Sequence, residues 1–309
     1  MKISIIGASG TIGSCAAFNI AIHNITNELV MIDNYAPDKL EGYVTDLTTS
    51  MVGMDIKVRS GNYEDMSGSN IVVMAAGSAQ VVANRMEVLP QNLPITKDIA
   101  SKIKQYCPET IVVTATNPVD PLNYAMYLSS GLDRNKCIGY SFNDSVRFRM
   151  FLAEALGVNS SQVGATVIGE HGGSQVLLFS SVRIKGKPFK VPAEIEQKIR
   201  QQVADLPKLL ESQRIKTGRT QGWVTSIGLT RICRAISKNT REIMPCSVVL
   251  DGDYGYKNLS ISVPIVIGKE GVSEIPEPSL SPEEQKGLER SVNTVRPSMQ
   301  YAEESSGNK

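Results

Sequence analysis

The 309-residue sequence is poor in cysteine, histidine and tryptophan, and it has no excess of charge of either sign. Its five cysteines are scattered and never spaced as C-x-x-C, which argues against a disulfide framework or a zinc site and favours a reducing cytoplasm. The net charge is +1 and no basic cluster is interleaved with aromatic residues, so neither nucleic acid nor a membrane is expected as a partner. No apolar run is long enough to cross a bilayer, and we expect no cleavable signal before the first predicted strand. These absences predict a cytoplasmic globular protein that binds no metal.

The N-terminal residues carry the pattern of a dinucleotide-binding turn. Strands are predicted over residues 2–6 and 28–32, with a helix over 11–21 between them. The G-x-x-G-x-x-G run between the first strand and the helix permits a tight turn, close approach of the backbone to a pyrophosphate and close helix packing. Asp33 ends the second strand, where a carboxylate accepts hydrogen bonds from an adenosine ribose and repels a 2′-phosphate. The pattern therefore predicts NAD rather than NADP, held by Gly7, Ala8, Ser9, Gly10, Thr11, Ile12, Gly13 and Asp33.

Strand-like and helix-like segments continue to alternate through the first half. Further strands are expected at residues 56–59, 70–75 and 110–114, and further helices at 38–49 and 95–106. Repeated strand-helix units predict a parallel, doubly wound sheet of the Rossmann type, with ligands at the carboxyl ends of the strands. Gly77 and Asn117 also fall at such ends, which strengthens the prediction of a site there.

The second half changes character after residue 140. The expected helices cover residues 144–156, 193–217, 222–238 and 281–302, and the expected strands cover 163–168, 177–184, 247–250 and 259–267. The last two strands suggest an antiparallel meander. We predict an α/β protein in which a Rossmann-type NAD-binding domain, residues 1–140, is followed by an α+β substrate-binding and catalytic domain, residues 141–309.

Three polar residues of the second half have the chemistry of an acid-base site. Asp144 and Arg147 are three positions apart on the predicted helix 144–156, so they share a face. His171 follows an apolar strand and lies between glycines that let the backbone approach a ligand. A carboxylate beside an imidazole suits proton exchange with a hydroxyl near neutral pH, and an arginine can bind a carboxylate with two parallel hydrogen bonds.

Taken together, these motifs resemble the lactate/malate dehydrogenase family, particularly its archaeal malate dehydrogenase members. The resemblance covers nearly the whole chain. It rests on G-A-S-G-T-I-G with Asp33, on D-K-L-E-G-Y-V-T-D-L at 38–47, on T-N-P-V-D at 116–120, on D-S-V-R-F-R at 144–149 and on I-G-E-H-G at 168–172.

The resemblance implies a role for each matching residue. Asp144 and His171 match the family's proton relay, and Arg147 matches the arginine that binds the substrate carboxylate. Arg85 best matches the loop arginine that polarises the reacting carbonyl. Asn117 matches the residue that contacts both substrate and nicotinamide. Further cofactor contacts are implied for Asn92, Ala115 and Thr116.

The substrate is less clearly indicated than the reaction. The loop 77–85 looks about one residue shorter than usual, and the position that reads the far end of the substrate is either Ala79 or Gln80. Malate enzymes usually have arginine there and lactate enzymes glutamine, so Gln80 favours a lactate/pyruvate enzyme. The likeness over the whole chain favours malate/oxaloacetate, which we prefer. The altered loop also leaves open a non-catalytic NAD-binding paralogue. The resemblance further implies a homo-oligomer, a dimer or a tetramer, with contacts through helices 38–49 and 222–238.

Overall fold

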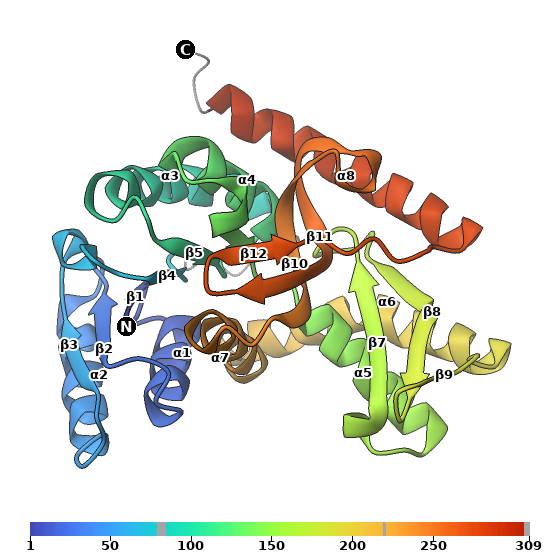
Figure 1. Ribbon diagram of the computed structural model, residues 1–309, viewed down its shortest axis with the longest axis horizontal. Coiled ribbons are helices and arrows are strands. Elements are labelled where there is room, and N and C mark those ends of the chain that lie inside the picture. Colours follow the sequence, from blue (N-terminus) through green and yellow to red (C-terminus); the bar gives the residue numbers. More distant parts are fainter. Residues whose placement is uncertain (79–84, 219–220, 306–309) are drawn as a thin grey trace.

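A mixed sheet forms the centre of the protein, which is described here by a computed structural model of residues 1–78, 85–218 and 221–305. Its parallel part has the strand order β3-β2-β1-β4-β5-β6, the arrangement of a doubly wound dinucleotide-binding fold (Figure 1). Buried apolar residues dominate these strands except the edge strand β3, as expected where helices cover both faces. The strands are β1 (Lys2–Ile6), β2 (Glu28–Ile32), β3 (Lys57–Ser60), β4 (Ile71–Met74), β5 (Ile111–Thr114) and β6 (Cys137–Gly139).

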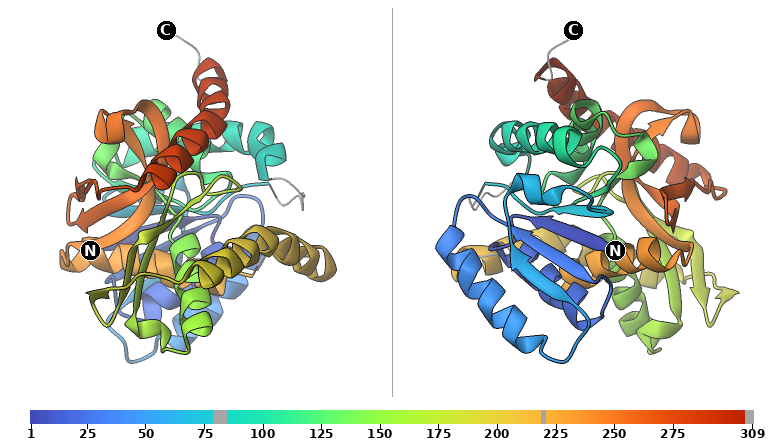
Figure 2. Two further views of the ribbon diagram at one scale, coloured as in Figure 1. Left: turned by 90° about the vertical axis from the view of Figure 1, so that its right-hand side faces the viewer. Right: turned by 60° about the vertical axis from the view of Figure 1, so that its left-hand side comes forward.

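Helices cover the two faces of this sheet (Figure 2). One face, which presents Ile5, Leu29 and Val73, packs against α1 (Thr11–Ile22) and α2 (Pro37–Ser50). The other face, which presents Val30 and Val72, packs against α3 (Leu89–Tyr106). Neighbouring positions of one strand thus face opposite layers, as the two-residue period of a strand requires. The predicted α/β fold with a Rossmann-type sheet is confirmed.

Three strands from the second half of the chain extend the same sheet. They are β10 (Glu242–Asp251), β11 (Lys257–Gly268) and β12 (Gly271–Glu274), and they are antiparallel. β10 joins the edge strand β6 through the pair Ser247 and Gly139. A Cβ on Gly139 would lie 2.9 Å from the Cβ of Ser247, so glycine permits this close approach. Because the two halves share one sheet, the domain boundary near residue 140 stays a prediction.

A smaller sheet with helices α5 and α6 lies on the right of Figure 1, and helix α8 runs along the top. The sheet contains β7 (Val163–Ile168), β8 (Val176–Ile184) and β9 (Lys187–Pro188). α5 (Asn143–Leu156) packs on β7 through a separate apolar cluster that includes Phe148 and Val167. α6 (Ala193–Thr217) packs on α5, and α8 (Pro282–Ser305) packs on β8, on β11 and on α4 (Val119–Ser130). None of the described helices is long and apolar enough to cross a membrane.

The structure corrects the sequence prediction in two places within the first half. α4 and β6 were not predicted, because α4 buries Leu122, Tyr124 and Met126 on several sides and so lacks a clear polar face. α3 begins at Leu89 rather than near residue 95, although Pro94 lies inside it. Leu93, the residue before Pro94, is buried, and this burial offsets the hydrogen bond that the proline removes.

Candidate active site

The predicted acid-base residues lie together between α5 and the loop that joins β7 to β8. Nδ1 of His171 is 2.6 Å from Oδ2 of Asp144, and both side chains are largely buried. Arg147, one turn further along α5, donates from Nη1 to the other oxygen of Asp144 at 3.4 Å, while about a fifth of its side chain stays exposed. The site therefore places an imidazole, a carboxylate and a guanidinium within one hydrogen-bonded group.

Hydrogen bonds on either side of Asp144 fix the start of α5. Asn143 accepts from the Tyr140 hydroxyl at 2.6 Å and donates to the hydroxyl of Thr225 at 2.9 Å. The hydroxyl of Ser145 accepts from the backbone N–H of Val167 at 2.9 Å. The first turn of α5 is thus bonded both to β7 and to the neighbouring helix α7 (Trp223–Lys238). These bonds orient Asp144 toward the loop that carries His171.

The loop that carries His171 is attached to α8. Gly169 has a φ of +90°, and a Cβ on it would lie 2.6 Å from the hydroxyl oxygen of Ser291, so glycine is required there. The same hydroxyl accepts from the backbone N–H of Glu170 at 2.6 Å. The Glu170 carboxylate in turn accepts from the backbone and the hydroxyl of Ser174 at 2.9 and 2.6 Å. A closed turn around His171 results.

A second carboxylate, that of Asp120 at the start of α4, lies beneath this loop. Its Oδ2 accepts from the backbone N–H of His171 at 2.8 Å, and its Oδ1 accepts from the Ser247 hydroxyl at 2.5 Å. Burial raises the pKa of Asp120 to about 6, against the opposing effect of these two bonds. Sequence reasoning placed Asp120 in the T-N-P-V-D motif without giving it a role. Asp120 and His171 are 51 positions apart in the chain, so no local sequence pattern predicts their contact.

The ends of β4 and β5 meet at Asn92 of α3. Its side chain accepts from the backbone N–H of Ser78 at 2.6 Å and donates to the carbonyl of Asn117 at 2.7 Å. A Cβ on Gly77 would lie 2.6 Å from the Thr116 side chain, which keeps these two strand ends in contact. The side-chain oxygen of Asn117 is buried and has no hydrogen-bond partner among the described residues. This orphaned acceptor fits a ligand that donates a hydrogen bond at the strand ends.

The three glycines of the first turn are needed for different structural reasons. Gly7 has a φ of +80°, and a Cβ on it would lie 2.5 Å from the backbone nitrogen of Ala76. A Cβ on Gly13 would lie 2.2 Å from the Gly7 carbonyl oxygen, so helix and turn pack backbone to backbone. Gly10, with a φ of −73°, caps α1 and meets only the Gly7 oxygen at 3.2 Å. Protein packing therefore explains Gly7 and Gly13, whereas a Cβ on Gly10 would meet no side chain within 4 Å. The cradle fits a pyrophosphate.

Asp33 lies against this cradle. Its Oδ2 accepts from the backbone N–H and the hydroxyl of Ser9 at 3.1 and 2.6 Å. Its Oδ1 accepts from the backbone N–H groups of Tyr35 and Ala36. Ala8 is buried beside the turn, and Thr11 and Ile12 open α1. Ala115 extends β5 by donating to the carbonyl of Met74. Every predicted cofactor contact thus lies at the carboxyl end of β1, β2 or β5, or on α1 or α3.

The side chains of two predicted site residues lie outside the described part of the structure. Gln80 lies outside the described residues. Arg85 begins the short 3₁₀ helix η2 (Arg85–Val88), but its side chain is outside the described part. Their proposed roles stay predictions. Within the described residues, no group of three or more histidine, cysteine or acidic side chains could hold a metal ion.

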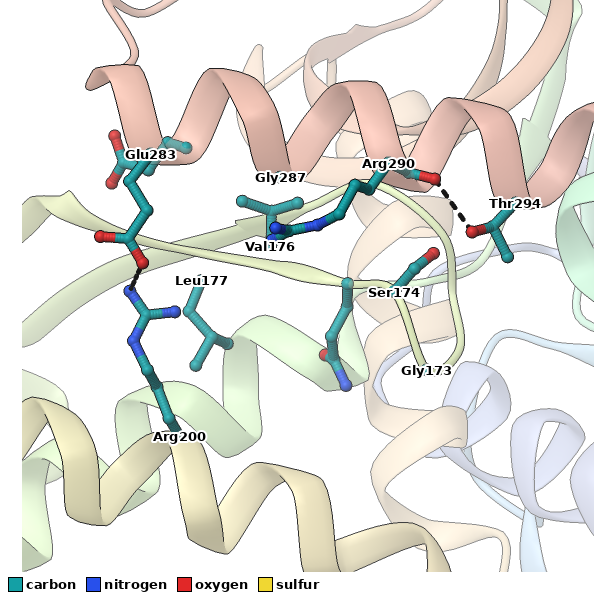
Figure 3. Close-up of a pocket in the computed structure, with 11 residues that line it drawn as sticks. Gly173, Ser174, Val176, Leu177, Arg200, Glu283, Gly287, Arg290 and Thr294 are labelled. Carbon is teal, nitrogen blue, oxygen red and sulfur yellow. Dashed lines mark hydrogen bonds and ion pairs between the residues drawn. The ribbon is translucent and has the colours of Figure 1, made fainter.

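A separate cavity of about 300 Å³ borders the far side of the His171 loop (Figure 3). Ser174, Val176 and Leu177 line one wall, and Arg200 of α6 spans the opening to Glu283 of α8 at 3.1 Å. Neither Asp144 nor His171 lines it. We therefore place the candidate active site at the Asp144–His171 pair and not in this cavity.

Comparison with known proteins agrees with this geometry. Residues 1–139 match the family described as lactate/malate dehydrogenase, NAD binding domain, and residues 143–306 match its alpha/beta C-terminal domain. A malate dehydrogenase of Halobacterium salinarum is 35% identical, and the match covers 98% of this chain and 99% of that protein. The crystal structure of Cryptosporidium parvum malate dehydrogenase has a TM-score of 0.91 and 31% identity, over 98% and 99% of the two chains. The lactate dehydrogenase of the same organism, solved with lactic acid and NAD, has a TM-score of 0.88 and 33% identity, over 98% of each chain. The chain therefore belongs to the lactate/malate dehydrogenase family and is an NAD-dependent 2-hydroxy acid dehydrogenase.

Proposed function

We propose that this protein is a malate dehydrogenase that interconverts malate and oxaloacetate with NAD. The observation that carries the proposal is the 2.6 Å contact between His171 and Asp144, with Arg147 one turn away on α5. This arrangement provides a group for proton transfer and a cation for a substrate carboxylate. Oxidation of an alcohol to a ketone needs both, together with a hydride acceptor.

His171 is the proposed acid-base residue. Asp144 bonds Nδ1 and thereby fixes the orientation and tautomer of the ring, so we assign proton exchange with the substrate hydroxyl to Nε2. In the oxidising direction His171 takes the hydroxyl proton, and Asp144 stabilises the imidazolium that results. In the reducing direction the protonated ring returns that proton to the ketone oxygen. Assistance of this kind is worth roughly 10² to 10⁴ in rate.

Two arginines and one asparagine are proposed to hold the substrate. The partly exposed guanidinium of Arg147 binds the carboxylate beside the reacting carbon with two parallel hydrogen bonds. Arg85 is assigned to the carbonyl oxygen, where it stabilises developing negative charge. Asn117, whose buried side-chain oxygen lacks a partner among the described residues, is assigned to the region where substrate and nicotinamide meet.

The residues at the strand ends suit NAD. The turn from Gly7 to Gly13 would hold the pyrophosphate at the N-terminus of α1, and Asp33 would accept from the ribose hydroxyls. When bound, the nicotinamide ring supplies the site that accepts or returns the hydride. The negative charge of Asp33 opposes the 2′-phosphate of NADP, so NAD is the proposed cofactor.

The choice of malate over lactate depends on the chain-wide similarity to malate dehydrogenases. The alternative is a lactate dehydrogenase. Gln80 favours pyruvate, because a buried second carboxylate without a cation would cost several kcal/mol. The deciding experiment measures NADH oxidation with oxaloacetate and with pyruvate, in wild type and in His171→Ala. Faster turnover of oxaloacetate, lost in the variant, is expected. Faster turnover of pyruvate would make this a lactate dehydrogenase.

The same assay distinguishes a non-catalytic paralogue. NADH binding without turnover of either acid would favour that alternative over an enzyme. Gln80→Arg is the matched variant for substrate choice, and it should raise the ratio of oxaloacetate to pyruvate turnover. An unchanged ratio would show that Gln80 does not determine the choice of substrate.

We further propose that the protein is a homo-oligomer and cytoplasmic. Phe18 and Ile22 of α1 and Val224 and Ile227 of α7 are each about half exposed, and the two helices are bonded through Asn19 and Ser226. An apolar face of this kind favours association with a second copy. A monomeric sedimentation profile would refute the proposed homo-oligomer.

All five cysteines are free thiols, which supports a reducing compartment. Localisation of a fluorescent fusion outside the cytoplasm would contradict the proposed cytoplasmic location.

A further inference from the structure

We propose that Asp120 is a positioning residue for the acid-base reaction, a second carboxylate that holds the backbone of His171 and favours the protonated state of its ring. The inference rests on the proposed function, because it assumes that His171 exchanges the substrate proton. No part of it requires contact between Asp120 and the substrate. The carboxylate acts from beneath the loop, through the His171 backbone and through its charge.

The first observation is that both oxygens of Asp120 are engaged. Oδ2 accepts from the His171 backbone at 2.8 Å and Oδ1 from the Ser247 hydroxyl at 2.5 Å. Ser247 lies 2.9 Å from the hydroxyl of Ser260, and Asn123 donates to that hydroxyl at 3.0 Å and to the Ser247 carbonyl at 3.2 Å. A buried polar network with one rigid carboxylate therefore joins α4, β10 and β11 directly under His171.

The second observation is that Asp120 is buried without a cationic partner among the described residues. Only 3% of the residue is exposed, and no lysine or arginine of the described part forms an ion pair with it. Burial in this position raises the pKa of Asp120 to about 6. An asparagine could accept from His171 and donate to Ser247 without that penalty. The two hydrogen bonds alone therefore do not require a negative charge at this position.

The cation that can offset this charge is the His171 imidazolium itself. The charge of His171 interacts with the Asp120 carboxylate and opposes the rise in the pKa of Asp120 that burial causes. Among the described residues, the charged groups near His171 include Asp144 and Arg147 from α5, Asp120 from α4 and Glu170, the residue before it in the loop. Arg147 already bonds Asp144. We therefore expect the negative charge of Asp120 to add to the charge of Asp144 in stabilising a protonated ring.

The decisive variant is Asp120→Asn, which keeps the shape and the hydrogen bonds but removes the charge. Reduction of the oxo acid needs a protonated His171, so its rate falls as pH rises. In the variant this fall should move to lower pH, because loss of a nearby negative charge disfavours a protonated ring. An unshifted profile would overturn the proposal, whatever happens to the rate itself.

Glu284→Gln is the matched control, because Glu284 is also a buried, hydrogen-bonded carboxylate but bonds Ser180 and Ser281 instead. It should leave the pH profile of the reaction unchanged.

Thermal melting checks that Asp120→Asn is folded. Because the pKa of Asp120 is raised in the fold, its contribution to stability is full below its unfolded value and lost as pH rises through about 6. At pH above 7 the melting temperature of Asp120→Asn should therefore equal or exceed that of wild type.

A second readout separates this inference from the proposed activity. The chain has two histidines, His23 and His171, so the ring of His171 can be titrated by proton NMR after His23→Gln assigns the signals. The midpoint for His171 should move to lower pH in Asp120→Asn, in the same direction as the rate profile. If the wild-type protein turns over neither acid but the midpoint moves, the proposed function fails and the inference survives. If activity is present and neither midpoint moves, the inference alone fails.

Discussion

Nδ1 of His171 lies 2.6 Å from Oδ2 of Asp144, although the two residues are 27 positions apart in the chain. Asp144 comes from the first turn of a helix and His171 from a loop that follows a strand. Their distance is set by bonds that fix both sides, from Ser145 to the strand and from Ser291 to the loop. The pair is thus held rigidly, as acid-base catalysis requires.

The first prediction concerns the carboxylate of this pair. Asp144→Asn should lower kcat by roughly 10²- to 10⁴-fold, because an amide cannot stabilise the imidazolium and can hold the wrong tautomer. Steady-state kinetics with the preferred oxo acid measures this. Fluorescence titration should give an unchanged affinity for NADH. A variant with full kcat would show that Asp144 has no part in proton transfer.

The second prediction concerns two arginines on the same helix. Arg147→Lys should lower kcat/KM roughly 10²-fold, mostly through a higher KM, because lysine cannot form two parallel hydrogen bonds to a carboxylate. Arg149→Lys is the matched control. Arg149 donates to the backbone of Ala165 at 2.8 Å and lies over the ring of Phe142, so the change should lower stability and leave KM unaltered. Equal effects of both variants on KM would argue against the role of Arg147.

Local patterns made the first half of the fold and the nucleotide turn predictable. The glycines around Gly10, the helix after them and Asp33 lie within one short stretch, and each has a local physical reason. α4 was missed because its residues are apolar on several sides, so no helical period appears. β10 pairs with β6 through Ser247 and Gly139, which are far apart in the chain, so no local pattern predicts this placement.

The candidate site was predictable to the extent that its residues lie in motifs. Asp144, Arg147 and His171 were found because they fall in D-S-V-R and G-E-H-G, and the structure brings them together. Ser291 and Ser247 were not found, since a serine in a helix or strand has no special pattern. Their contacts to the His171 loop and to Asp120 arise only when α8 and β10 pack.

The third prediction separates two glycines of the nucleotide turn. Gly13→Ala should destabilise the fold, because the new Cβ would lie 2.2 Å from the Gly7 carbonyl oxygen. Gly10→Ala should destabilise the fold less, since its φ of −73° suits alanine and the new Cβ would lie 3.2 Å from the same oxygen. It should nevertheless weaken NADH binding tenfold or more, because the methyl group occupies the approach to the helix N-terminus. Undiminished binding by a folded Gly10→Ala would refute a pyrophosphate at this turn.

The fourth prediction is a pH dependence of stability at the start of α8. Burial raises the pKa of Glu284, but bonds from Ser180 and Ser281 outweigh it and leave the pKa below its usual value. A lowered pKa stabilises the fold above the unfolded value, and this stabilisation is lost as pH falls through the folded value. Glu284→Gln should therefore lower the free energy of unfolding at pH 7 by about 1 to 3 kcal/mol, and by less near pH 3. Denaturant unfolding at both pH values measures the difference, and an equal loss at both would contradict it.

The last prediction concerns the apolar face on α1 and α7. Ile227 is 48% exposed in the single chain, so a charge there should change the stability of a monomer by only a few tenths of a kcal/mol. In an interface the same charge would lose its water without gaining a partner, which strongly opposes association. Ile227→Glu should therefore shift sedimentation toward the monomer, whereas Leu209→Glu, at a similarly exposed position of α6, should not. Trp223, the single tryptophan, is 80% exposed at the start of α7 and should report the separation as a red shift of its fluorescence. If both variants keep the wild-type assembly, the contact between subunits must lie elsewhere on the chain.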